Sequence, residues 1–160
     1  MTVVVSDTSP INYLILIDAI FVLPELFTSV VIPKAVSEEL QHAQTPEPVK
    51  EWLHDLPEWA QIAEAAAVDN TLKLDAGEKE ALALAQELGG VPILMDERKG
   101  RVVAKSFGLI TTGTLNILEE AAVKNLIDIE EALRKLNETS FYLSAELIDR
   151  FKKQVTERKS

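Results

Sequence analysis

The chain has no cysteine and only two histidines, His42 and His54, so several classes of active site have no side chains to build them. Without thiols it can form no disulfide, no thiolate metal site and no cysteine nucleophile. A zinc enzyme or a Ser-His-Asp triad would depend on these two imidazoles alone. Any catalytic chemistry is therefore expected to come mainly from oxygen-bearing side chains.

Long apolar runs and positive charge are also scarce. No run approaches the ~18 residues of a membrane span, and residues 1–3 show no basic region or cleavage site of a signal peptide. We therefore expect a cytoplasmic protein with no membrane segment. The formal net charge is −10, from 16 basic and 26 acidic residues. This charge argues against broad, passive binding of nucleic acid, but it is compatible with an enzyme that holds a polyanion through cations in an acidic pocket.

Two apolar runs that end in acids organise the chain. Val3–Val5 leads through Ser6 into Asp7, and the run 91–95 leads into Asp96. Each predicts a buried strand with a charge at its carboxyl end, followed by a helix. In open α/β sheets, ligands bind at the carboxyl ends of the strands. The two aspartates are therefore the first candidate site residues.

The remaining pattern alternates predicted strands with predicted helices. A helix opens at Ser9, as N-cap, and Pro10. Further strands are expected over 29–32, 59–63 and 109–112, and further helices over 34–43, 48–54, 78–88, 98–107, 115–124, 130–136 and 144–154. With 160 residues and 47% hydrophobic residues, the chain suits one domain. We predict an α/β fold in three layers, with a mostly parallel central sheet between helices.

Helical spacing separates the helical acids into two groups. Glu39 and Glu78 extend apolar stripes, so their carboxylates are expected to face inward, whereas Glu38 and Glu80 are expected to face solvent. Taken singly, each acid also has a structural interpretation, as a helix cap, a dipole partner or a flanking residue. Taken together, two strand-end Asp and two inward Glu offer four oxygen ligands. Such a set favours a hard cation, Mg²⁺ or Mn²⁺.

Four segments resemble the PIN domains, small metal-dependent nucleases that include the VapC-like toxins of toxin–antitoxin pairs. The matching segments are residues 5–10, 32–40, 74–85 and 93–97, followed by the glycine-containing stretch 100–115. The resemblance implies a ribonuclease that uses Mg²⁺ or Mn²⁺, with RNA as substrate, a cognate antitoxin as partner, and a homodimer. It implies a nuclease domain over 1–140, with the helix in 141–160 belonging to the domain or forming an interface.

The resemblance also assigns roles to residues. Its catalytic and metal-binding acids correspond to Asp7, Glu39, Glu78 and Asp96; Glu97, Glu80 and Ser9 are secondary candidates; and Arg98 and Arg101 are candidates for guiding the RNA backbone. Two other functions remain open at this point. Asp7 could accept a phosphoryl group, as in receiver or haloacid-dehalogenase-like domains, although Ser9 stands where the latter place a second Asp. Alternatively, the domain could bind a partner without catalysis.

Overall fold

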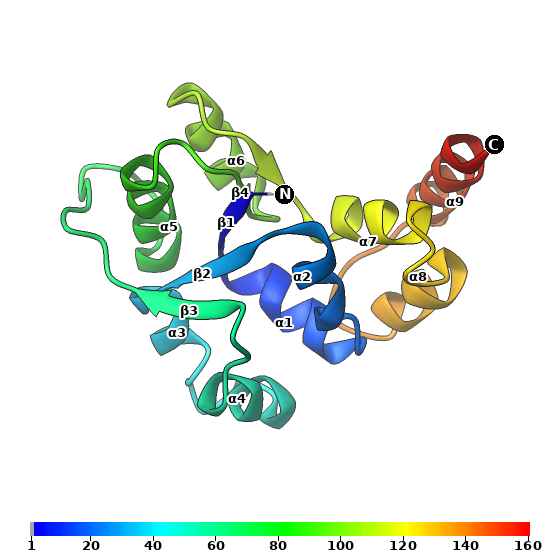
Figure 1. The fold of residues 1–160 in the computed structure, drawn as a ribbon, viewed down its shortest axis with the longest axis horizontal. Helices are drawn as coiled ribbons and strands as arrows, with labels where there is room; N and C mark the ends of the chain where they lie inside the picture. The colour runs from blue at the N-terminus through cyan, green and yellow to red at the C-terminus, as the bar shows by residue number, and fades with distance from the viewer. Residues whose placement is uncertain (1) are drawn as a thin grey trace.

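Five parallel strands form the central sheet of this computed structural model, which describes residues 2–160 (Figure 1). Their order is β3-β2-β1-β4-β5, and every pair is parallel. The strands are β1 (Val3–Ser6), β2 (Ser29–Pro33), β3 (Ala60–Ala63), β4 (Ile93–Leu94) and β5 (Thr111–Thr112). The predicted α/β class with a central sheet between helices is confirmed, and the sheet is wholly parallel.

Helices connect the strands and complete the chain. They are α1 (Thr8–Leu16), the 3₁₀ turn η1 (Ile20–Val22), α2 (Leu23–Leu26), α3 (Lys34–Glu39), α4 (Glu47–His54), α5 (Ala76–Glu87), α6 (Arg98–Ser106), α7 (Thr114–Val123), α8 (Ile129–Asn137) and α9 (Ala145–Lys159). Helix α3 ends four residues earlier than predicted. Gln41 N–H and His42 N–H bond to the carbonyls three residues back, and this tight turn closes the helix.

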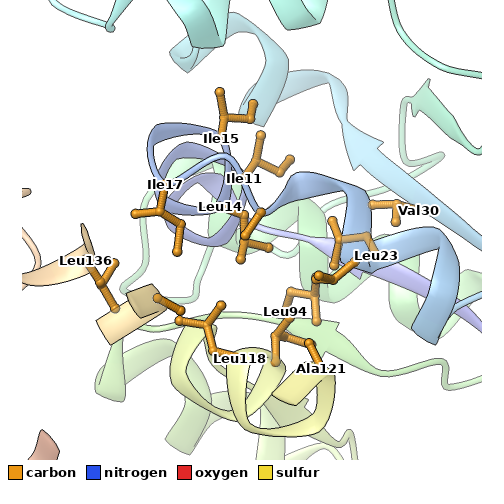
Figure 2. Close-up of a cluster of buried hydrophobic side chains, with 14 of the residues drawn as sticks. Ile11, Leu14, Ile15, Ile17, Leu23, Val30, Leu94, Leu118, Ala121 and Leu136 are labelled. Carbon is orange, nitrogen blue, oxygen red and sulfur yellow. The ribbon is translucent and has the colours of Figure 1, made fainter. Parts of the chain in front are cut away.

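The sheet separates two hydrophobic cores because side chains alternate along each strand. Val4, Val30 and Leu94 belong to the cluster formed with α1, α4, α7 and α8. Figure 2 shows Val30 and Leu94 in this cluster with side chains of α1 and α7. Val5 and Ile93 belong to the second cluster, formed with α5 and α6. Strands buried on both faces require continuous apolar runs, which explains why the sequence pattern identified β1 and β4.

The strand order reverses between β1 and β4. From β1 the chain proceeds outward to β2 and β3, and it then returns to β4 on the other side of β1. Asp7 N–H donates to the Leu94 carbonyl at 2.9 Å, so Asp7 and the segment leaving β4 lie at the same sheet edge. A crevice for ligands is expected at the carboxyl ends of strands where such a reversal occurs. The topology therefore places the residues after β1 and β4 where a site is expected.

The last helix, α9, packs on α7 and α8 within the chain. Phe151 and Val155 are buried, so this helix packs part of its apolar face inside the fold. Arg158 at its end contacts Glu119 and Glu120 of α7, each at 2.7 Å. Within residues 2–160, no single helix has the length and apolar character to cross a membrane. The one pair that meets both criteria together, α1 with residues 20–26, is bent by 118°.

Candidate active site

Asp7 lies at the start of α1 and is 7% exposed. The helix begins at Thr8, so Asp7 and not Ser9 occupies the N-cap position; the predicted Ser9 cap is wrong. The Asp7 side chain makes no capping bond. Burial raises the pKa of Asp7 to about 7; a bond from Thr8 N–H opposes the shift, and the charges of nearby acids add to it. The carboxyl group of Asp7 is therefore desolvated at the crevice and is not used to cap the helix.

Glu39 brings a second carboxylate to Asp7 from the end of α3. Its residue is exposed, but Thr8 Oγ1 donates a hydrogen bond of 2.8 Å to Glu39 Oε2. Gly77 lies against both acids: a Cβ there would stand 3.4 Å from Asp7 Oδ1 and 3.4 Å from Glu39 Oε2. The hydroxyl that supports this pair belongs to Thr8, whereas the side chain of Ser9 forms no hydrogen bond within residues 2–160.

Glu78 is the third acid and is 6% exposed. Its Oε1 accepts from Asp75 N–H at 3.2 Å, while Glu78 N–H donates to Asp75 Oδ1 at 2.8 Å, which forms a capping box. Its Oε2 is buried without a hydrogen-bond partner in the described chain. Glycine at position 100 allows this approach, because a Cβ there would come within 2.7 Å of Oε2. Such a buried, unpartnered oxygen is costly unless something else satisfies it.

Electrostatics link the three acids and reveal a neighbour that the sequence interpretation missed. Burial raises the pKa of Glu78 to about 7; bonding to Asp75 N–H opposes this, and the Asp75 and Glu97 charges add to it. The charges of Asp75, Glu78 and Glu39 also raise the pKa of Asp7. Asp75 is not among the candidate site residues predicted from the sequence. The spacing of Asp75 and Glu78, an acid three residues before a Glu at a helix start, is the capping-box signal that could have identified it.

Asp96 is held separately, at the start of α7. Thr114 N–H donates to Oδ1 and Thr114 Oγ1 to Oδ2, both at 2.7 Å. Burial raises the pKa of Asp96, and the Thr114 bonds and the nearby Arg101 oppose the rise. Asp7 and Glu39 thus meet against Gly77, and the charge of Glu78 acts on Asp7 from beside Gly100. Both oxygens of Asp96 instead accept hydrogen bonds from Thr114.

Glu80 does not face solvent, so the sequence prediction for it is wrong. It is 7% exposed, and it accepts hydrogen bonds from Ala35 N–H at 2.7 Å and Ala65 N–H at 3.1 Å. Two residues along α5 correspond to ~200° around the helix axis, so Glu80 and Glu78 project in different directions. Glu80 therefore joins α5 to the start of α3 and to the segment after β3. Glu38, by contrast, is exposed as expected.

Replacing Glu80 by Gln should lower stability more than an ordinary surface change. The variant loses a charged acceptor, and its amide NH₂ faces one of two backbone donors. Hydrogen bonds to charged groups contribute roughly 1.5–3 kcal/mol, and we expect a loss of about that size in the free energy of unfolding. Urea denaturation measures it. The matched control is Glu38→Gln, which should change stability by less than about 0.5 kcal/mol; equal values for the two variants would contradict the assignment.

A basic cavity of about 630 Å³ lies on the α6 and β5 side of Asp96, and a Cβ on Gly113 would stand 2.9 Å from Asp96 Oδ1 and 3.9 Å from Arg101 Nη1. Arg98, Arg101 and Lys105 line it, together with apolar residues that include Leu109 and Ile110. The three cations follow an i, i+3, i+7 spacing, so they share one face of α6. None of them forms an ion pair in the part of the chain that the structure describes. On a chain of net charge −10, this face is a local concentration of positive charge that could attract an anion.

The acids offer oxygen donors for a hard cation, and the free Glu78 Oε2 fits such a ligand. The three acids do not stand at coordinating distances: within residues 2–160, no group of three His, Cys, Asp or Glu side chains has the arrangement of a metal site. Like charges ~4 Å apart repel by roughly 4 kcal/mol at an effective dielectric near 20, so close approach of these carboxylates requires a cation or protons. The donor chemistry fits a hard cation, and the carboxylates would have to move closer together to coordinate one.

Comparison with known proteins identifies the family. No curated protein matches the chain. A family model described as a PIN domain matches residues 3–157. PIN domains are generally nucleases and typically use divalent metal ions. Because the match covers nearly the whole sequence and the parallel sheet is consistent with this fold, the chain belongs to the PIN-domain family.

Proposed function

We propose that this PIN domain is an endoribonuclease that depends on Mg²⁺ or Mn²⁺. Two observations carry the proposal: Asp7 and Glu39 meet against Gly77, and Glu78, whose charge acts on Asp7, has an Oε2 that is buried and unpartnered beside Gly100. These three residues would hold the metal, with Asp96 as the fourth acid of the site. A bound divalent cation supplies positive charge against the phosphate and lowers the pKa of water for attack on phosphorus.

The residues around the acids have distinct tasks in this proposal. Thr8 orients Glu39 through its hydroxyl, and the capping box orients Glu78 while leaving one of its oxygens free. Thr114 fixes Asp96 through two hydrogen bonds. No protein nucleophile is required, which agrees with the absence of cysteine and the scarcity of histidine. The protein thus contributes positioning, desolvation and negative charge for cation binding.

The acid neighbours of Asp7 count against its phosphorylation. A phosphoryl group on Asp7 would add negative charge beside Glu39 and Glu78, which already raise the Asp7 pKa. We therefore favour hydrolysis over an aspartyl-phosphate intermediate. Incubation with acetyl phosphate followed by intact-mass measurement should leave the mass of the chain unchanged. A covalent adduct on Asp7 would reverse this preference.

The basic cavity supports RNA as the substrate, because its three unpaired cations can bind phosphates next to the acids. Replacing Arg98 and Lys105 by Gln should weaken RNA binding and flatten its salt dependence. Each phosphate contact contributes about −0.7 to the slope of log affinity against log salt for single strands. The slope of the double variant should therefore be shallower by up to about 1.4. Fluorescence anisotropy across a salt series measures it. Lys124→Gln, an exposed position at the end of α7, should leave the slope unchanged, and equal slopes in all three proteins would exclude this cavity.

The VapC-like resemblance leads us to propose further that the protein is the toxin of a toxin–antitoxin pair, that it forms homodimers, and that an antitoxin inhibits it. The primary experiment is incubation of purified protein with RNA and Mn²⁺ or EDTA, followed by sequencing of the new RNA ends. Defined internal cuts that require the metal support the proposal. Intact RNA under both conditions would overturn it.

A further inference from the structure

A second cavity, of about 400 Å³, adjoins the acids on the side opposite the basic cavity. It lies between α1 and the loop from α3 to α4, and Thr8 and Glu39 form part of its wall. Its volume falls within the range of small-molecule sites, which is about 300–1,000 Å³. Since Glu39 belongs both to this wall and to the acid group near Gly77, an occupant of the cavity would lie directly beside the candidate active site.

The second cavity, here called the polar cavity, combines polar side chains with the apolar Leu40 and Pro46. Its wall includes the side chains of Ser9, Asn12, Tyr13, His42, Gln44 and Thr45, and no lysine or arginine. Phosphate recognition normally uses cations, as in the basic cavity, so this second cavity is unsuited to a phosphate. Neutral amides and hydroxyls are instead suited to groups that carry both donors and acceptors. The two cavities therefore differ in the chemistry they can recognise.

Two amides in this cavity are available for a ligand. The side chains of Asn12 and Gln44 make no hydrogen bond within residues 2–160. Tyr13 is fixed instead: its hydroxyl lies 2.8 Å from Ser140 Oγ, and its ring meets Phe141 edge-on at 5.0 Å. A rigid aromatic wall beside free amides and the ring of His42 offers both contact surface and hydrogen-bonding groups.

We propose that this cavity binds the base of a nucleotide that neighbours the scissile phosphate in single-stranded RNA. Asn12 and Gln44 would read the edge of the base, and His42 would contact its face, as proteins commonly recognise unpaired bases. The inference rests on the proposed ribonuclease function. The polar cavity lies beside Glu39 at one end of the carboxyl edge of the sheet. Asp7 comes next along this edge and then Asp96, and the basic cavity lies beyond Asp96. The RNA would therefore present a base on one side of the acids and phosphates on the other.

Binding measurements test the subsite without any need for cleavage. Short oligonucleotides of A, C, G or U are titrated into the full chain with Ca²⁺ and followed by fluorescence anisotropy. A good bidentate contact discriminates by about 1–3 kcal/mol, so we expect one base to bind roughly 5- to 150-fold more tightly. Asn12→Ala combined with Gln44→Ala should reduce this ratio to within about twofold. Gln61→Ala on β3, which also removes an exposed amide, should preserve it.

Cleavage of an RNA with a randomised segment provides the second readout. With Mn²⁺, the wild type should show a base preference at one position next to the cut, and the double variant should lose that preference while still cutting. A preference that survives in the double variant would overturn the subsite while leaving the nuclease function standing. Absence of cutting by the wild type would overturn the nuclease function. The Ca²⁺ titration would then decide on the subsite by itself. Equal affinities for all four bases in that titration would reject the subsite.

Discussion

Asp7→Asn should reduce single-turnover RNA cleavage with saturating Mn²⁺ by a factor of about 10²–10⁴. The variant keeps the size of the side chain but removes a charge that attracts the cation, and cations supply several kcal/mol of transition-state stabilisation. The fold should tolerate the change, because the Asp7 carboxyl is buried beside three other acids and its ionisation is opposed. We therefore expect activity to fall while the stability of the metal-free protein is retained or improved.

A comparison along α5 separates metal binding from structural support. Glu78→Gln should lose cleavage to a similar degree as Asp7→Asn, because Oε2 has no other task in the chain. Glu80→Gln should instead lose stability, and well below its melting temperature it should cleave within a few-fold of wild type. Cleavage and thermal melts are recorded on the same samples. If Glu80→Gln abolishes cleavage while Glu78→Gln spares it, the assignment of the third acid is wrong.

The metal-free protein should become less stable as pH rises from 5 to 8. The folded-state pKa of Asp7 is about 7, against an ordinary value of 3.8, so the native state binds a proton that the unfolded chain releases more readily. This contribution is complete below about pH 4, and it is lost as pH rises through about 7. At 1.36 kcal/mol per pH unit, the whole loss for Asp7 is at most about 4 kcal/mol, of which about 3 kcal/mol falls between pH 5 and 8. Glu78 acts in the same direction.

Urea denaturation in EDTA between pH 5 and 8 measures this dependence, and Asp7→Asn should make it shallower and leave the contribution of Glu78. Adding Mn²⁺ at pH 8 should restore stability in the wild type, since a ligand that binds only the native state stabilises it by mass action. The same addition should have much less effect on Asp7→Asn. Stability that is independent of pH in EDTA, or equal Mn²⁺ shifts in the two proteins, would contradict the proposed cluster.

Sequence patterns predicted those features that depend on residues close together in the chain. Buried parallel strands need continuous apolar runs, so β1 and β4 and the acids at their ends were recognisable. The environment of Glu80 was not, because its partners Ala35 and Ala65 lie 45 and 15 residues away and donate through the backbone, which has no sequence signature. Helical periodicity shows that Glu80 lies on a different face of α5 from Glu78, but it does not show what the Glu80 face contacts.

The early end of α3 also escaped prediction, since it depends on a turn that competes with a well-formed helical pattern. This matters at the site, because the loop that follows forms one side of the polar cavity, opposite α1. Asp75 is a different case. Its capping-box spacing is local, so Asp75 could have been recognised from the sequence as the cap of α5. The sequence could not show that Asp75 engages only one oxygen of Glu78 and that the other oxygen is buried without a partner.

The position of Thr114 has a consequence for any shortening of the chain. The same helix that presents Thr114 to Asp96 at its first turn carries Glu119 and Glu120, which receive Arg158 from the final helix. Proteolysis or a frameshift that removes α9 would thus expose the side of α7 that α9 covers. We expect the hydrogen bonds from Thr114 to hold Asp96, more than 45 residues upstream, less firmly as a result. A chain that lacks α9 is therefore expected to position Asp96 less accurately, in addition to being shorter.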